Sequence, residues 1–344
     1  MIEIIRPGAL ASVQDLGRTG FRRLGVGSCG AMDTLAVAVG NRLLGNAPEC
    51  AAIEITLGRA AVRFHADMRV ALAGAECGAT LDGTPVWSWH AFDVHAGEVL
   101  ELPPARGGTH AYLCVAGGID VEPVMGSRST DLKAAFGGLG GRALQEGDRL
   151  PVGRAGLPAA RLPGDRDWIG VQAPAWALPA DVDGKATPVR MLPGPEYEDF
   201  EAESQQALWQ SDWIVTPNSN RMGLRLNGPA LARRADRSAD LLSHGVVPGV
   251  MQVPPAGQPI ALMADAQTTG GYPKIGVVIG ADLWRLAQVP LGAAVRFVPV
   301  TLAQAVAAQA ELDRYLRQID QALQWQGDGM AIAARRRTLT RAAA

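Results

Sequence analysis

The chain has 344 residues, a length that accommodates two domains, each of which can bury its own core. Hydrophobic residues make up 48%, charged residues 19% and the formal net charge is −2, which argues against nucleic acid or an anionic membrane as a partner. No apolar run reaches the roughly 18 residues of a membrane span, and the N-terminus lacks the pattern of a signal peptide, so we expect a cytoplasmic protein.

The first 160 residues predict a β-rich lobe. Short apolar runs alternate with glycine and proline, as in Gly97–Pro103 and Gly147–Val152, where a glycine turn leads into a strand. A helix is predicted over Ala31–Leu44, with Asp33 placed to cap its N-terminus. Cys29 lies just before this helix, but no histidine is close to it in the sequence, which disfavours a nucleophilic thiol.

The other cysteines and the histidines predict no metal site. The four cysteines are 21, 27 and 37 residues apart, with no Cys-x-x-Cys pair, and the five histidines show no ligand spacing on a shared element. Near the N-terminus, Gln14, Asp15 and Arg18 fit either an internal salt-linked turn or a functional cluster, and the sequence leaves both interpretations open.

The second half of the chain predicts a similar lobe followed by a helix. The irregular stretch Gly153–Arg166 suggests that the first lobe covers residues 1–160 and the second 161–300. Residues 301–344 predict a C-terminal helix over Thr301–Gln326 and a mobile basic tail. The apolar stripe of that helix consists of Leu312, Leu316, Ile319 and Leu323.

The densest polar segment is the loop Met263–Gly276, which lies between Pro259–Met263 and Ile275–Ile279, two runs that predict buried strands. The loop contains Asp265, Gln267, Thr268, Thr269, Gly270, Gly271, Tyr272 and Lys274. A turn needs the glycines but not the other side chains. Only three of the 32 basic residues are lysines, so the retained Lys274 indicates a compact ammonium that stabilises an oxyanion or loses its proton when desolvated.

A second polar segment, Pro217–Pro229, begins with Asn218, Asn220 and Arg221. Two asparagines near a proline fit a plain turn. Amides and a guanidinium just before a strand equally fit a ligand that carries a carboxylate or an amide. The residues alone do not decide between the two interpretations.

Six motifs follow one another in order along residues 3 to 300: Ser12–Arg18, Ser127–Leu132, Pro217–Gly223, Gln252–Pro254, Ala264–Gly276 and Ala281–Leu283. Together they resemble one family, the C-subunit group of the 5-oxoprolinases. This group is also called allophanate hydrolase subunit 2-like or biotin-dependent carboxyltransferase-like, and it includes KipA. One departure is Cys29, which interrupts the Ser-Gly-Ala-Met-Asp run that the family usually shows.

The resemblance implies a mainly β (α+β) fold of two cyclophilin-like β-barrel lobes with a few helices and a C-terminal helix. It also implies a cytoplasmic hetero-oligomer with two partners, a KipI-like B-subunit and a lactam-utilisation A-subunit. In that family the complex is a hydrolase that opens 5-oxoproline to glutamate and uses ATP, with Mg²⁺, as its cofactor. No nucleic acid or membrane partner is expected.

The resemblance also suggests roles for the two polar segments. Lys274 is expected to neutralise charge, and Thr268, Thr269 and the amides of Gly270 and Gly271 to act as oxyanion donors. Asn218, Asn220 and Arg221 are expected to hold the carboxylate or amide of the substrate. Asp265 is expected to orient Lys274 or to bind Mg²⁺, and Gln267 to hydrogen-bond the substrate beside Tyr272.

Two alternatives stay open at this point. The first is the carboxyltransferase component of a biotin-dependent urea or amide carboxylase, in which carboxybiotin arrives on a separate carrier because this chain has no Ala-Met-Lys-Met-type segment. The second is a KipA-like regulatory protein that binds a kinase inhibitor and catalyses nothing itself.

Overall fold

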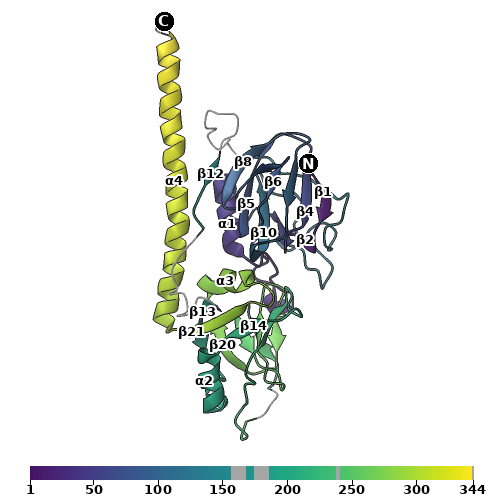
Figure 1. The fold of residues 1–344 in the computed structure, drawn as a ribbon, viewed down its shortest axis with the longest axis vertical. Coiled ribbons are helices and arrows are strands. Elements are labelled where there is room, and N and C mark those ends of the chain that lie inside the picture. Colours follow the sequence, from purple (N-terminus) through teal and green to yellow (C-terminus); the bar gives the residue numbers. More distant parts are fainter. Residues whose placement is uncertain (156–167, 174–185, 238–240, 343–344) are drawn as a thin grey trace.

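The computed structural model describes residues 1–155, 168–173, 186–237 and 241–342, and the side chains of the last helix as far as residue 326. Two β-rich lobes follow each other along the chain, and a long helix lies beside them (Figure 1). The expected mainly β fold with few helices is confirmed. No helix in the described part of the chain has both the length and the apolar character needed to cross a membrane.

The N-terminal lobe consists of two six-stranded sheets with the main hydrophobic core between them. The first sheet contains β1 (Ile2–Pro7), β4 (Ala60–Phe64), β6 (Thr80–Leu81), β7 (Thr84–Pro85), β9 (Val99–Leu102) and β11 (Arg149–Leu150). The second contains β2 (Leu10–Gln14), β3 (Ala52–Thr56), β5 (Met68–Glu76), β8 (His90–Val94), β10 (Gly107–Val115) and β12 (Ile169–Gly170). The predicted strands after Gly97 and Gly147 correspond to β9 and β11.

Helix α1 (Thr34–Leu43) packs against the outer face of the second sheet, and Asp33 caps it by accepting a hydrogen bond from the Ala36 amide, as predicted. Small residues on β5 and β8 allow this close packing. A Cβ on Gly40 would lie 2.6 Å from the Cys114 sulfur, so only glycine fits at that point of the helix.

The C-terminal lobe is a closed seven-stranded barrel. Its strands are β13 (Ala186–Pro193), β14 (Trp213–Val215), β15 (Gly223–Asn227), β17 (Val250–Gln252), β18 (Ile260–Leu262), β20 (Lys274–Val278) and β21 (Ala294–Pro299). Parallel pairing of β13 with β21 closes the ring. The other elements of this lobe are α2 (Ala202–Gln210), α3 (Leu283–Gln288) and a two-stranded pair, β16 (His244–Gly245) with β19 (Thr269–Gly270). Single 3₁₀ turns cover Arg22–Leu24, Tyr197–Asp199 and Gly280–Asp282.

Helix α4 (Leu302–Ala342) packs against the C-terminal lobe near its start, where Ala308 contacts Ile279 and Ala281, and then extends along the N-terminal lobe (Figure 1). Its predicted stripe contacts a cluster that includes residues of α1, β5 and β10, and Ile319 is buried there. Arg42 of α1 and Asp320 of α4 form an ion pair of 3.0 Å. The helix continues beyond its predicted end at Gln326, through residues that we expected to form a tail.

The predicted boundary between the lobes, at residue 160, lies outside the described residues, as does most of the irregular stretch Gly153–Arg166 that contains it. Ile169–Gly170 pair with β8, so the chain still contributes to the first lobe after that position. The two lobes are joined by Gln288 of α3, whose side chain makes four hydrogen bonds to the N-terminal lobe. It donates to Asp33 and to the His110 carbonyl, and it accepts from the amides of Thr109 and His110.

Candidate functional site

The polar loop Met263–Gly276 connects β18 to β20, as the flanking apolar runs predicted. The Thr268 carbonyl of this loop accepts a hydrogen bond from the Val246 amide, and β19, which lies within the loop, pairs with β16. Alternate residues of β15 and β18, such as Leu224 and Ala261, fill the barrel core, so the remaining side chains of these strands lie on the outer face of the barrel wall.

A pocket of about 200 Å³ lies on this outer face, beside the loop. Its lining residues are Asn220, Met222, Gly223, Arg225, Gln252, Ile260, Leu262, Gln267 and Tyr272. Three residues that were predicted separately as ligands, Asn220, Gln267 and Tyr272, therefore come together here. The volume is below the range typical of drug-sized ligands, so the pocket suits a small molecule. We call it the amide pocket.

Among the side-chain amides of the pocket, one NH₂ group and one carbonyl oxygen have no hydrogen-bond partner in the described part of the chain. Gln267 donates from Nε2 to Oε1 of Gln252 at 3.3 Å, and Gln252 donates to the Tyr272 carbonyl at 3.5 Å. Oδ1 of Asn220 accepts the Met222 amide at 2.8 Å. Among the described residues no hydrogen-bond partner is recorded for the Asn220 NH₂ group or for Oε1 of Gln267. A ligand with one carbonyl and one N–H complements this pair.

A row of residues on the outer face runs across four neighbouring strands, and three of them, Gln252, Ile260 and Arg225, line the amide pocket. Strand pairing places Lys274 opposite Gln252, Gln252 opposite Ile260, and Ile260 opposite Arg225. Directly opposed residues point to the same face of a sheet. A register shift between Met251 and Gln252 contributes to this alignment, in keeping with the tendency of β-bulges to re-aim side chains near functional sites.

Lys274 lies at one end of this row and is not among the residues that line the pocket. It is 4% exposed, and its Nζ lies 3.1 Å from a carboxylate oxygen of Glu196. The same oxygen accepts the Lys274 backbone amide at 2.9 Å. Nζ also reaches the Tyr272 carbonyl at 3.5 Å, which Gln252 contacts from the pocket side. Its ammonium is therefore neutralised behind the pocket wall, and its catalytic role stays a prediction.

Asp265 does not pair with Lys274 but with Arg221, which corrects the expectation that it orients the lysine. Both carboxylate oxygens of Asp265 accept from the guanidinium at 2.9 Å. Arg221 also donates to Glu54 and to the Gly30 carbonyl of the N-terminal lobe. The sequence could not show this pairing because Glu54 is 167 residues away.

The Arg221 ion pairs are buried between the two lobes. Burial alone would raise the pKa of Glu54, but Arg221, followed by His110, holds it below its usual range. Burial raises the pKa of Asp265, although Arg221 opposes this change. The guanidinium already faces two protein carboxylates, so its contacts do not support the expected role as a ligand for a substrate carboxylate.

The remaining predicted residues lie outside the amide pocket. Thr268 contributes a backbone carbonyl to the loop, and Thr269 is exposed on β19. A Cβ on Gly270 would lie 2.6 Å from the Gln252 amide nitrogen, and one on Gly271 would lie 2.6 Å from the Leu241 carbonyl. Close packing therefore accounts for both glycines. Asn218 lines a neighbouring pocket of about 440 Å³ that shares Arg225 and Ile260 with the amide pocket.

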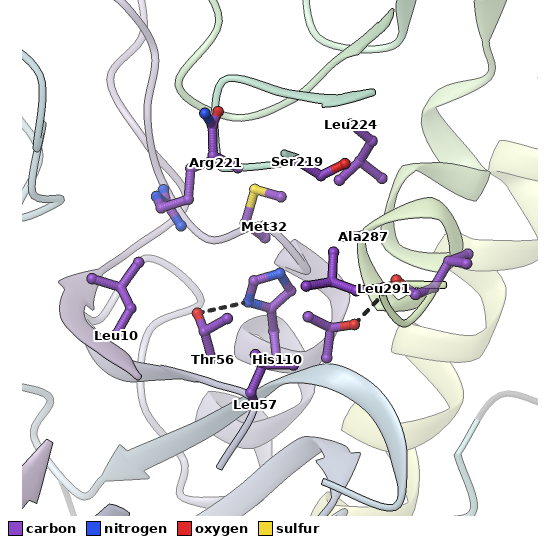
Figure 2. Close-up of a pocket in the computed structure, with 13 residues that line it drawn as sticks. Leu10, Met32, Thr56, Leu57, His110, Ser219, Arg221, Leu224, Ala287 and Leu291 are labelled. Atoms are coloured by element: carbon purple, nitrogen blue, oxygen red, sulfur yellow. Dashed lines mark hydrogen bonds between the residues drawn. The ribbon is translucent and has the colours of Figure 1, made fainter. Parts of the chain in front are cut away.

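Another pocket, of about 200 Å³, lies between the two lobes. Figure 2 shows that His110, Met32, Leu10 and Ala287 point into it, with Arg221 at its edge. His110 hydrogen-bonds Thr56 at 3.2 Å, and burial lowers its pKa to about 4. The wall is thus mainly apolar and the imidazole is neutral at pH 7. We interpret this pocket as part of the lobe interface.

The N-terminal motifs form an internal structural cluster. The Asp15 carboxylate accepts hydrogen bonds from the Ser127 and Ser129 hydroxyls and from the Arg128 amide. Arg18 donates to the Ser129 carbonyl. The first and second family-like motifs therefore bind each other, which agrees with the structural interpretation of Asp15 and Arg18. Burial, together with Asp265 and Asp131, raises the pKa of the nearby Cys29 thiol, which keeps it protonated.

Two residues of the amide pocket, Arg225 and Gln252, were not among the predicted ligands. A signal for Arg225 was present in the alternation Leu224-Arg225-Leu226-Asn227, which places the arginine on the polar face of a strand. Gln252 lies within a family-like motif, Gln252–Pro254, but no local pattern distinguishes its side chain from a structural one.

Comparison with known proteins agrees with the sequence motifs. Residues 24–299 match the family model of the carboxyltransferase domain, subdomain A and B. The chain is 47% identical to the C-subunit of 5-oxoprolinase from Escherichia coli, over 93% of this chain and 97% of that protein. The chain belongs to the 5-oxoprolinase C-subunit family. The Haemophilus influenzae member is 43% identical over similar shares of both chains.

The family extends to larger proteins. The chain is 31% identical to urea amidolyase of Saccharomyces cerevisiae, over 93% of this chain and 18% of that protein. Among solved structures, the urea carboxylase of Kluyveromyces lactis has a TM-score of 0.80 at 28% identity and covers 92% of this chain. This chain spans only 29% of the length of that urea carboxylase. The fold of the 5-oxoprolinase C-subunit therefore recurs as one part of these larger proteins.

Proposed function

We propose that this chain works in a 5-oxoprolinase complex that opens 5-oxoproline to glutamate with ATP hydrolysis in the cytoplasm. Its partners in this proposal are a KipI-like B-subunit and a lactam-utilisation A-subunit. The observation that carries the proposal is the 47% identity to the C-subunit of 5-oxoprolinase from Escherichia coli over almost the full length of both chains.

The amide pocket supports a cyclic amide as the substrate. In this proposal the free NH₂ group of Asn220 donates to the lactam carbonyl, and Oε1 of Gln267 accepts the lactam N–H. Ile260 and Leu262 provide an apolar surface against the ring. When the lactam opens, negative charge builds on the carbonyl oxygen, so the Asn220 donor becomes more favourable in the transition state.

The described residues do not fit a complete Mg²⁺–ATP site. Neither the amide pocket nor the neighbouring pocket has a carboxylate among its lining residues, and Mg²⁺ prefers carboxylate ligands. In the described part of the chain, no group of three or more His, Cys, Asp or Glu residues is arranged to hold a metal. We therefore assign the nucleotide to the assembled complex and derive no step of this chain through it.

A second candidate is the carboxyltransferase component of a biotin-dependent urea or amide carboxylase. The family model and the likeness to Kluyveromyces lactis urea carboxylase favour it. Urea also offers one carbonyl and N–H groups to Asn220 and Gln267. In that case carboxybiotin comes from a separate carrier protein.

The deciding experiment measures ADP release by this chain co-purified with its two partner chains, with and without 5-oxoproline. Release that depends on both 5-oxoproline and this chain supports the oxoprolinase. If the three chains associate and show no such release, the oxoprolinase proposal is wrong, and urea with carboxybiotin is tested next. Gln267→Ala should lower the 5-oxoproline-dependent rate. Gln206→Ala on the exposed face of α2 is the matched control.

A further inference from the structure

Arg225 carries a positive charge that no described residue of the protein neutralises. It lies at the end of the row of residues on the outer face, and its side chain lines both the amide pocket and the neighbouring pocket. Its backbone N–H and carbonyl are bound by the Ser219 hydroxyl, which fixes the strand locally. No hydrogen bond or ion pair from its guanidinium to any described residue is recorded.

This isolation distinguishes Arg225 from the other pocket-lining arginine. Arg221, four residues earlier, is bound by Asp265 and Glu54 and serves the contact between the lobes. Elsewhere in the C-terminal lobe, Arg296 pairs with Asp212 and Arg190 with Asp282. Arg225 instead faces two pockets whose lining residues include no carboxylate. An anion that enters either pocket therefore meets an uncompensated guanidinium.

The spacing between Arg225 and the amides matches a small ligand with a negative charge at one end. Arg225 and Gln252 are separated by two strand spacings, on the order of 10 Å between their backbones. The long arginine side chain shortens this gap. The available polar groups of Asn220 and Gln267 border the same pocket. A ring that carries a carboxylate next to its amide nitrogen satisfies all three groups together.

We propose that Arg225 binds the carboxylate of a small cyclic amide whose carbonyl and N–H are held by Asn220 and Gln267. This inference rests on the proposed function, and it names the residue that selects a lactam acid over a neutral amide such as urea. A guanidinium pairs with a carboxylate through two parallel hydrogen bonds, which a neutral substrate cannot provide.

The test compares 5-oxoproline with its uncharged analogue 2-pyrrolidinone in the three-chain complex. Arg225→Ala should raise the KM for 5-oxoproline about 10- to 100-fold, the range for loss of a hydrogen-bonded charge pair. It should leave kcat within about twofold, because the carboxylate does not react. The inhibition constant of 2-pyrrolidinone should not change. Arg225→Lys keeps the positive charge but cannot form two parallel hydrogen bonds with a carboxylate, so it should give an intermediate KM.

Arg314→Ala is the matched control, because Arg314 is an exposed arginine of α4 that lines none of the three pockets. If Arg225→Ala leaves the KM for 5-oxoproline unchanged, the inference is wrong. A parallel rise in the inhibition constant of 2-pyrrolidinone also overturns it, because that result indicates a damaged pocket.

The two proposals fail in different ways. Absence of 5-oxoproline-dependent ADP release in the wild-type complex refutes the proposed function. Calorimetric titration of the purified chain with 5-oxoproline then tests the site by itself. Binding that Arg225→Ala removes and Arg314→Ala retains supports the anion site, whereas no binding to the wild-type chain overturns it.

Discussion

Replacing Arg221 with methionine should strongly destabilise the protein, because it removes the cation between two buried carboxylates. The side chains of Glu54 and Asp265 are 1% and 6% exposed, so solvent cannot replace the guanidinium. Removal of one partner from a buried ion pair typically costs about 3–5 kcal/mol of unfolding free energy. That loss is a large fraction of the roughly 5–15 kcal/mol by which proteins are stable.

The effect of Arg221→Met should also depend on pH. Without the guanidinium, burial raises the pKa of Glu54, so the folded variant binds more protons than the unfolded chain above about pH 4.5. Stability falls with rising pH wherever the folded state binds more protons. The variant should therefore lose more stability, relative to the wild type, at pH 8 than at pH 5.

Urea unfolding followed by tryptophan fluorescence measures both effects. Arg296→Met is the control, since Arg296 pairs with Asp212 at 2.7 Å but both side chains are about one-third exposed. Such a surface pair contributes about 0–1 kcal/mol. An Arg221→Met protein within about 1 kcal/mol of the wild type, with a raised KM for 5-oxoproline, would refute the structural role and restore the original prediction of a substrate ligand.

Three further outcomes are expected. Lys274→Met leaves Glu196 without its cation and should lower the free energy of unfolding, measured in urea, by about 1–3 kcal/mol. If this variant shows unchanged turnover in the complex, Lys274 has no role in the mechanism. His110 has a pKa of about 4 in the folded protein, against about 6.5 for an ordinary histidine in the unfolded chain. Between these two pH values the unfolded chain binds one more proton than the folded protein, so the free energy of unfolding falls as the pH drops. From pH 7 to 5 the wild type should lose about 2 kcal/mol more than His110→Gln, and equal losses would contradict the assignment. Ile319→Ala should cost about 2–5 kcal/mol and increase hydrogen exchange in α4, whereas exposed Gln318→Ala should not.

Local patterns predicted much of the fold. The Asp33 cap, the stripe of α4 and the strands on either side of the polar loop depend on residues close in sequence, and the structure confirms them. The packing of α4 on the first lobe was not predictable, because an apolar stripe does not identify the surface that it covers. The partners of Arg221 and Lys274 are likewise distant, since Glu54 and Glu196 lie 167 and 78 residues away.

The same distinction explains why the local sequence singled out Arg221 and not Arg225. Arg221 stands beside two asparagines and completes a polar cluster in the sequence, but tertiary contacts bind its guanidinium to the protein. Arg225 stands between two leucines, and this alternation places it on the polar face of a strand without marking it as a ligand. Those leucines fill the barrel core, and their inward direction forces Arg225 outward into the pocket wall. A charged residue in an alternating strand is therefore a better candidate ligand when its neighbours are core residues and no carboxylate faces it.

The position of the amide pocket also bears on how the site is completed. Side chains such as Met251 and Leu226 fill the interior of the barrel, so a ligand must bind on the outer face of its wall. There the described lining residues provide amides, a guanidinium and a phenol, which are groups suited to holding a small polar ligand. The described lining has no carboxylate, imidazole or thiol to act as a general base. Opening a lactam therefore requires reacting groups from outside this lining. An outer-face pocket allows a second chain to supply them, in agreement with the proposal that this chain works together with partner subunits.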